Sequence, residues 1–172
     1  MDTRPTSDRL RETLFNVLTP RIESASFLDL YAGSGAVGIE AQSRGAKSAT
    51  FVERADTALK VLRGNLALLG LKAEVHKASA ASFLRKAAAG VKRFDLVFLD
   101  PPYEAAEEYE ATLGLLGGGA AGVLAEGALV IAEHARRVKL DAEFGALRRT
   151  RLLEQGDATL SFYEICEPER VP

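Results

Sequence analysis

The chain has 172 residues and a formal net charge of −2, with 47% hydrophobic and 27% charged residues. This length predicts a single domain over residues 1–172, and a composition so close to the globular average excludes a disordered chain. One cysteine excludes an internal disulfide framework, and the two separated histidines give no zinc-ligand spacing, so we expect no metal. Because the sequence has no apolar run long enough to span a bilayer and no apolar signal segment, we expect a cytoplasmic protein without a membrane partner.

The apolar pattern predicts strands and helices in alternation. An N-terminal helical segment over residues 1–22 contains an amphipathic helix that begins near Asp8. Further elements are expected in a core over residues 23–134: strands at 26–31, 48–52, 74–77, 94–99 and 128–133, and helices at 36–44, 55–69, 79–89 and from beyond 103 to about 116. Such alternation is typical of a mainly parallel sheet covered on both faces, with ligands at the carboxyl ends of its strands.

The remaining segments are predicted to have other structures. The glycine-rich stretch at residues 117–122 is interpreted as a mobile connection. Residues 146–153 and 159–166 flank a tight turn, so they are expected to form an antiparallel hairpin within a C-terminal part over residues 135–172.

A glycine-rich loop follows the first predicted strand. Residues 33–38 read GSGAVG, which satisfies the pattern G-x-G-x-x-G, and Glu53 follows at the end of the second strand. Gly33 and Gly35 allow a ligand to approach the backbone, while the Glu53 carboxylate suits ribose hydroxyls. Asp29 opposes a pyrophosphate but attracts an ammonium and a sulfonium, which favours S-adenosylmethionine over NAD. The alternative is that Asp29 turns outward to cap a loop and that the glycines only make a turn.

Three more residues are candidate cofactor contacts. The third strand ends before Ser79 and Ala80, where an adenine ring is expected. The Ser79 hydroxyl can accept a hydrogen bond from the adenine amine, and the backbone N–H of Ala80 can donate one. Ser79 serves equally well as the N-cap of the next helix. Tyr31, at the end of the first strand, is the third candidate.

The strongest predicted strand, residues 94–99, ends in Asp100, Pro101, Pro102 and Tyr103. Two successive prolines make a rigid extended corner with free carbonyl acceptors. The Asp100 carboxylate and the Pro101 carbonyl can each accept one hydrogen bond from an exocyclic amine, which directs the nitrogen lone pair at a methyl group. Tyr103 offers a stacking face for a base that is flipped out of its helix. The alternative is that the prolines only end a buried strand and Asp100 caps the next helix.

Four segments of the sequence resemble the RsmD family of bacterial methyltransferases. They are residues 29–41 (DLYAGSGAVGIEA), 51–54 (FVER), 94–103 (FDLVFLDPPY) and 4–12 (RPTSDRLRE). The resemblance implies a Rossmann-like class I methyltransferase fold with a seven-stranded, mainly parallel sheet and an antiparallel last strand. It also implies S-adenosylmethionine as the methyl donor and N2 of a guanine in 16S ribosomal RNA, or in the assembling small subunit, as the acceptor.

This chain departs from the family pattern at two places. Members of the family usually begin with a short basic β-segment before the RPT motif, and this segment is absent here. Where the family commonly has an aspartate for the adenine amine, this chain has Ser79.

Basic residues that are candidates for RNA contacts lie in two runs of the sequence. Residues 136–151 contain six basic and two acidic side chains, and a smaller group lies at the start of the chain. The candidates are Arg4, Arg9, Arg11, Arg136, Arg148 and Arg151. The alternative for each of them is an ordinary surface charge that contacts solvent or pairs with a neighbouring carboxylate.

Three other functions compete with an RNA guanine-N2 methyltransferase that acts as a monomer. A DNA amino-methyltransferase shares the amine chemistry but usually needs a target-recognition segment. This chain is too short to contain such a segment in addition to the methyltransferase core. An NAD-binding oxidoreductase lacks a second domain and leaves residues 100–103 unexplained. A non-catalytic RNA-binding factor does not account for the presence of Asp100, Gly33, Gly35 and Glu53 together.

Overall fold

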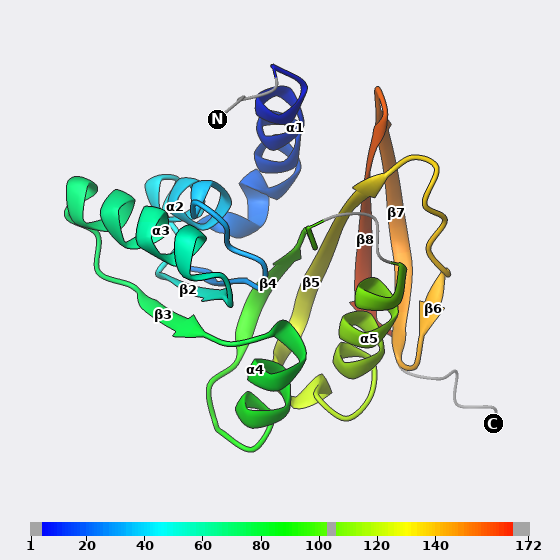
Figure 1. The fold of residues 1–172 in the computed structure, drawn as a ribbon. Helices are drawn as coiled ribbons and strands as arrows, with labels where there is room; N and C mark the ends of the chain where they lie inside the picture. Colours follow the sequence, from blue (N-terminus) through cyan, green and yellow to red (C-terminus); the bar gives the residue numbers. More distant parts are fainter. Residues whose placement is uncertain (1–4, 103–105, 167–172) are drawn as a thin grey trace, which may run out of the picture.

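The computed structural model describes residues 5–102 and 106–166, whose helices and strands are shown in Figure 1. The helices are α1 (Pro5–Ile22), α2 (Ala36–Ser43), α3 (Asp56–Leu69), α4 (Ala80–Ala87), α5 (Ala106–Leu116) and the short 3-10 helix η1 (Ala121–Val123). The strands are β1 (Ser26–Asp29), β2 (Ser48–Glu53), β3 (Glu74–Lys77), β4 (Phe94–Leu99), β5 (Leu124–Ala135), β6 (Glu143–Phe144), β7 (Leu147–Gln155) and β8 (Ala158–Ile165). The predicted alternation of strands and helices is confirmed, although β5 begins four residues earlier than expected.

All strands belong to one eight-stranded sheet in the order β3-β2-β1-β4-β5-β8-β7-β6. The strands β1 to β5 are parallel, and β8 lies between β5 and β7, antiparallel to both. This confirms the Rossmann-like sheet with its antiparallel last strand, but the expected number of seven strands is wrong. The additional strand is β6, which forms because Gly145 adopts a φ of +59° and turns Phe144 back to pair with Leu147.

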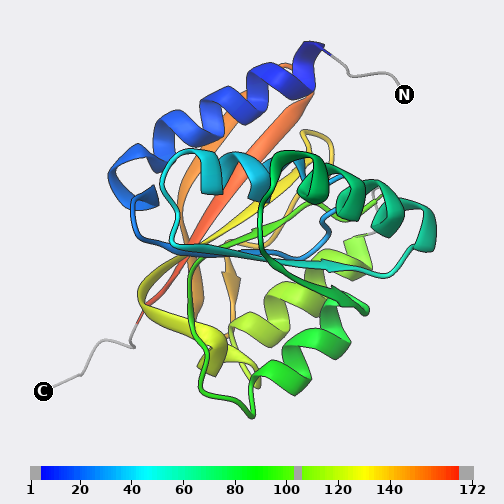
Figure 2. The ribbon, with the colours of Figure 1, turned by 90° about the vertical axis from the view of Figure 1, so that its left-hand side faces the viewer.

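Helices cover both faces of the sheet, as Figure 2 shows: α1, α2 and α3 lie on one face, and α4 and α5 lie on the other. Alternate side chains of β4 enter opposite layers of the core. Leu96 and Phe98 pack in the layer that contains residues of α1, whereas Val97 and Leu99 pack in the layer that contains residues of α5. Because both faces of this strand are buried, its sequence is a nearly continuous apolar run.

The interpretation of residues 117–122 as a mobile connection is corrected by their packing. The Gly117 carbonyl accepts a hydrogen bond from the Ala146 backbone N–H (2.8 Å), and Ala120 is fully buried. A Cβ atom on Gly117 would lie 1.7 Å from the Phe144 carbonyl oxygen. The glycine is therefore required for the close approach between the end of α5 and the turn before β7, which the low-complexity composition of the stretch does not reveal.

The fold positions five connecting segments at one edge of the sheet. Since β1 to β5 are parallel, the segments that follow their carboxyl ends meet there. In the part of the chain that the structure describes, no helix combines the length and apolar character needed to cross a membrane.

Candidate functional site

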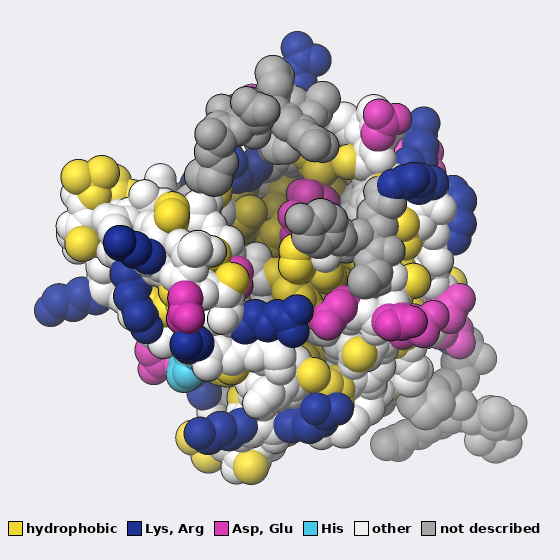
Figure 3. All heavy atoms as spheres, viewed as in Figure 1, with side chains coloured by type: hydrophobic (Ala, Val, Ile, Leu, Met, Phe, Trp, Pro, Cys, Tyr) yellow, Lys and Arg dark blue, Asp and Glu magenta, His cyan; other side chains and the backbone are white. Residues whose placement is uncertain are grey.

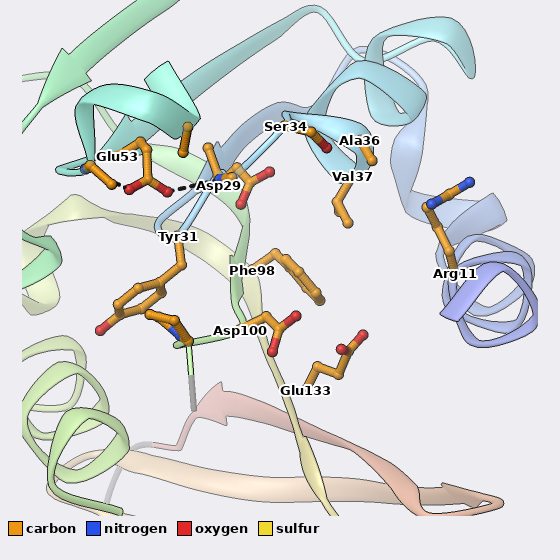
Figure 4. Close-up of a pocket in the computed structure, with 15 residues that line it drawn as sticks. Arg11, Asp29, Tyr31, Ser34, Ala36, Val37, Glu53, Phe98, Asp100 and Glu133 are labelled. Carbon is orange, nitrogen blue, oxygen red and sulfur yellow. Dashed lines mark hydrogen bonds between the residues drawn. The ribbon is translucent and has the colours of Figure 1, made fainter. Parts of the chain in front are cut away.

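A cavity of about 480 Å³ lies at the carboxyl edge of the parallel strands. Its walls come from the ends of β1, β2, β4 and β5, from the glycine loop and from α1. Figure 3 shows a hollow in this face, with hydrophobic and acidic side chains around it. The residues at its centre are Asp29, Gly33, Glu53, Asp100 and Glu133, which Figure 4 shows with their neighbours. Four of these five were predicted from the sequence as site residues.

The glycine loop uses its glycines in different ways. Gly33 has a φ of +56° and borders the cavity, and no atom lies within 4 Å of the place where a Cβ would stand. This position is therefore open to a ligand. Gly35 is buried and does not line the cavity; a Cβ there would lie 2.3 Å from Leu62 Cδ1. Gly35 therefore allows the loop to pack on α3 rather than contacting the cavity directly.

Asp29 lies in the wall of the cavity and is only 1% exposed. Its Oδ2 accepts a hydrogen bond from the Gly38 backbone N–H (3.3 Å), so it faces α2 and the cavity, and the alternative that it turns outward is excluded. Burial, together with the charges of Glu53 and Glu133, raises the pKa of Asp29 to about 7 against the opposing hydrogen bond from Gly38. A cation beside this buried side chain therefore stabilises its ionised form.

Glu53 and Tyr31 form the wall between this cavity and a second one. The two Glu53 carboxylate oxygens accept hydrogen bonds from the backbone N–H groups of Gly33 (2.9 Å) and Ala55 (2.8 Å), which fix the side chain. The Tyr31 hydroxyl donates to Glu108 Oε2 (2.8 Å) and lies 2.7 Å from Thr112 Oγ1. Burial raises the pKa of Tyr31 above its usual range, so its hydroxyl remains protonated.

The second cavity, of about 510 Å³, extends from Tyr31 and Glu53 toward α4. Ser79 and Ala80, the two residues predicted to lie at the adenine, are among the residues that line it. The Ser79 hydroxyl accepts a hydrogen bond from the Ser82 backbone N–H (3.1 Å), so Ser79 is the N-cap of α4. The role of Ser79 as the N-cap of α4 is therefore compatible with a contact to a ligand, because the capping residue also borders this cavity.

Asp100 and Pro101 follow β4 directly, with Pro101 buried and Pro102 bordering both cavities. Asp100 borders the first cavity and is exposed to it, although the protein atoms around it lower its hydration. Burial, the adjacent charge of Glu133 and the charge of Asp29 together raise the pKa of Asp100 well above its usual range. Tyr103, expected to stack on the base, lies outside the described residues.

The sequence interpretation did not identify Glu133 as a site residue. In the sheet register Leu99 pairs with Ala132, so Asp100 and Glu133 follow adjacent positions of β4 and β5. Both carboxyl groups point into the same cavity (Figure 4). Burial raises the pKa of Glu133, whereas a side-chain hydrogen bond with Asp100 and the charge of Arg11 lower it. The position of Glu133 at the end of a predicted parallel strand was the available signal.

The N-terminal arginines have different surroundings. Arg11 borders the cavity and forms ion pairs with Asp8 (3.3 Å) and Glu40 (3.8 Å). Arg9 is exposed on α1, and Arg4 lies outside the described residues. Of the three, Arg11 is therefore the one that the structure places at the site.

The arginines of residues 136–151 do not form one patch. Arg136 follows the carboxyl end of β5 and pairs with Glu154 (2.6 Å). Arg148 pairs with Glu143 (3.3 Å) near the start of β7, about 20 Å from Glu154 at the usual rise per residue of a strand. Arg151 lies over the Phe162 ring, 5.9 Å from its centroid. Of Arg136, Arg148 and Arg151, Arg136 is the one that follows the carboxyl end of β5, the edge of the sheet at which the cavity lies.

The sheet order, the antiparallel last strand and the position of the cavity define the Rossmann-like fold of class I methyltransferases. A family model described as "Conserved hypothetical protein 95" matches residues 1–164. The chain belongs to this family, the RsmD family, as its sequence motifs predicted.

Related proteins and solved structures are similar over most of the chain. YlbH of Bacillus subtilis is 37% identical over 164 residues, which are 94% of this chain and 88% of YlbH. Ribosomal RNA small subunit methyltransferase D of Escherichia coli K12 is 45% identical over 131 residues, 76% of this chain and 63% of that protein. The structure of yhhF from Escherichia coli has a TM-score of 0.81 at 37% identity, covering 94% of this chain and 87% of that one.

A more distant structure contains ligands. It is the 16S rRNA N2 G1207 methyltransferase RsmC of Thermus thermophilus in complex with AdoMet and guanosine. Its TM-score is 0.74 at 25% identity, and the match covers 95% of this chain and 43% of that one.

Proposed function

We propose that this chain transfers a methyl group from S-adenosylmethionine to the exocyclic N2 amine of a guanine in 16S ribosomal RNA of the small subunit. The observation that carries the proposal is the position of Asp100 at the end of β4, beside Asp29 and the glycine loop in one cavity, with Pro101 buried directly after it. The names of the Escherichia coli and Thermus thermophilus relatives support the class of substrate and the N2 atom.

The residues of the two cavities fit S-adenosylmethionine. Asp29 supplies a buried anionic wall for the cationic part of the cofactor, and Gly33 leaves space for close approach. Glu53 uses each oxygen for one backbone N–H and retains acceptor capacity for ribose hydroxyls. Ser79 and Ala80 border the space for the adenine. When bound, the cofactor supplies a methyl group that its sulfonium already activates.

The acceptor amine needs help from the protein because its lone pair is delocalised into the purine ring. The Asp100 carboxylate and the Pro101 carbonyl each accept one of its two N–H hydrogen bonds, which turns the lone pair toward the methyl group. The amine loses one proton after it is methylated. The raised pKa of Asp100 makes this carboxylate a better acceptor for that proton than an ordinary aspartate. The target base must leave its helix to reach the cavity.

The proposed function is tested by incubating the protein with S-adenosylmethionine carrying a labelled methyl group. Small-subunit particles, free 16S RNA and duplex DNA are offered in parallel, and the products are digested to nucleosides. The expected product is N2-methylguanosine, formed with the ribosomal substrates alone. Label in adenine or cytosine, or in DNA, contradicts the proposal.

The role of Asp100 predicts a separation of turnover from cofactor binding. Asp100→Ala is expected to reduce methyl transfer by at least about 100-fold, because positioning and general acid–base groups contribute factors of this size. Cofactor affinity, measured by calorimetry, is expected to change less than about threefold, since Asp29, Glu53 and the glycine loop remain. The control is Asp141→Asn, an exposed aspartate away from the cavity. Equal losses of affinity and turnover in Asp100→Ala mean that Asp100 has a structural role.

A further inference from the structure

Glu133 is held beside Asp100 by the backbone of two neighbouring strands. Its own carbonyl accepts a hydrogen bond from the Tyr109 hydroxyl (2.7 Å), which ties the end of β5 to α5. The main chain is thereby fixed at this residue, while the carboxylate remains in the cavity next to Asp100 (Figure 4). Two acidic side chains consequently face one cavity from adjacent strands.

This arrangement is unfavourable in the free protein. Each carboxyl group loses hydration, and the negative charges repel one another when both groups are ionised, whereas a side-chain hydrogen bond joins the two when one of them is protonated. Asp29 adds a third acid from β1. Arg11, on α1, borders the same cavity, and its charge favours the ionised form of Glu133. A pair of acids held this way suits a ligand that offers several hydrogen-bond donors in one plane.

Guanine has such a set of donors. Its N1–H and the two N–H groups of its N2 amine lie side by side on one edge of the base. In adenine and cytosine, the ring nitrogen next to the exocyclic amine is an acceptor with a lone pair. A carboxylate opposite that ring atom therefore gains a hydrogen bond from guanine and meets a repulsive lone pair in the other two bases.

We propose that Glu133 selects guanine by accepting a hydrogen bond from its N1–H while Asp100 and the Pro101 carbonyl hold the N2 amine. This inference rests on the proposed function and names the residue that restricts it to one base. Only Asp100 and Pro101 are needed to direct an amine toward a methyl group, so Glu133 acts on specificity more than on the chemistry. A site built to hydrogen-bond a substrate group discriminates strongly against an analogue that lacks the group.

The test compares guanine with 2-aminopurine, which keeps the amine at C2 but has no hydrogen on N1. Particles are reconstituted with either base at the nucleotide that the labelled-methyl experiment identifies. Wild-type protein is expected to prefer guanine by at least about 100-fold in kcat/KM. Glu133→Gln is expected to reduce this preference at least about tenfold, because a side-chain amide can donate to the unprotonated N1 of 2-aminopurine. Any effect of the analogue on the particle is the same for both enzymes and cancels in this comparison.

Two further variants control the experiment. Glu126→Gln changes an exposed glutamate on the same strand, far from the cavity, and is expected to keep the wild-type preference. Glu133→Asp keeps the carboxylate on a shorter side chain, so it is expected to lose rate but to retain a preference for guanine. This variant tests the inference even where Glu133→Gln does not fold.

The outcomes separate the inference from the function on which it rests. If wild-type protein forms no N2-methylguanosine, the proposed function fails. If it forms that product but Glu133→Gln slows transfer to both bases by the same factor, Glu133 is only structural and the inference alone is wrong. If Glu133→Asp loses the preference for guanine although its cofactor affinity is normal, the inference is likewise wrong.

Discussion

Asp29 couples cofactor binding to a proton. Burial and the charges of Glu53 and Glu133 together raise its pKa to about 7. A cationic ligand favours the ionised form of Asp29. Below pH 7 the carboxyl group is mostly protonated, so it must release its proton before it can attract the ligand. We therefore expect the affinity for S-adenosylmethionine to fall as the pH decreases from 7 to 5, approaching about tenfold per pH unit, and to be nearly constant above pH 8. Calorimetry in buffers of different ionisation enthalpy measures the affinity and the protons released.

Asp29→Asn isolates this effect from Asp100 and Glu133, which also titrate in the cavity. The variant is expected to bind more weakly than wild type at pH 8 and to lose most of the dependence on pH. Asp157→Asn, in the exposed turn before β8, serves as the control and should behave like wild type. If the affinity of Asp29→Asn for S-adenosylmethionine depends on pH as in wild type, the proton released on binding comes from another group.

Single residues differ in how far their sequence positions reveal their roles. Asp29, Glu53 and Asp100 lie next to recognisable glycine or proline patterns, so the sequence is sufficient to nominate them. Glu133 has no such neighbour, and it becomes a site residue only when the pairing of Leu99 with Ala132 places it beside Asp100. Its nomination therefore requires the order and register of strands that are distant in the sequence.

Among the helices and strands, the long elements could be predicted from the sequence, whereas close contacts between the backbones of distant segments could not. The helix α3 follows directly from the helical spacing of its apolar residues, and the strand β4 follows from a short apolar run that ends at two prolines. The strand β6 has only two residues and depends on the turn at Gly145. Gly117 could not be distinguished from its glycine neighbours by composition, since its role depends on the distant residue Phe144.

The close packing at Gly117 makes the glycine-rich stretch sensitive to one substitution. In Gly117→Ala the new Cβ would overlap the Phe144 carbonyl oxygen, so backbone must move at the end of α5 or at the turn before β7. We expect the free energy of unfolding to fall by about 1–3 kcal/mol, as in other overpacked sites. Gly119→Ala is the matched control, because no atom lies within 4 Å of the position of its Cβ. Urea denaturation compares both variants, and equal stability of the two contradicts a specific role for Gly117.

For the whole molecule, the distribution of charge matters more than its sum. The net charge is only −2, yet Figure 3 shows basic side chains around the face that contains the hollow and acidic side chains near the hollow itself. Phosphates can contact the basic side chains at the edges of this face while a flipped base enters the acidic cavity. The direction of the parallel strands therefore decides which arginines can assist binding.

Arg136 and Arg148 provide a matched test of this arrangement. Both are exposed and both pair with a glutamate, so charge reversal should cost each a similar, small amount of stability. Only Arg136 follows the carboxyl end of β5, three residues beyond Glu133. We expect Arg136→Glu to weaken binding to small-subunit particles. The slope of log affinity against log salt concentration should also decrease, by about one for each phosphate contact that is lost. Arg148→Glu should leave both quantities near their wild-type values, and an equal loss in the two variants would mean that RNA does not approach from the carboxyl edge of the sheet.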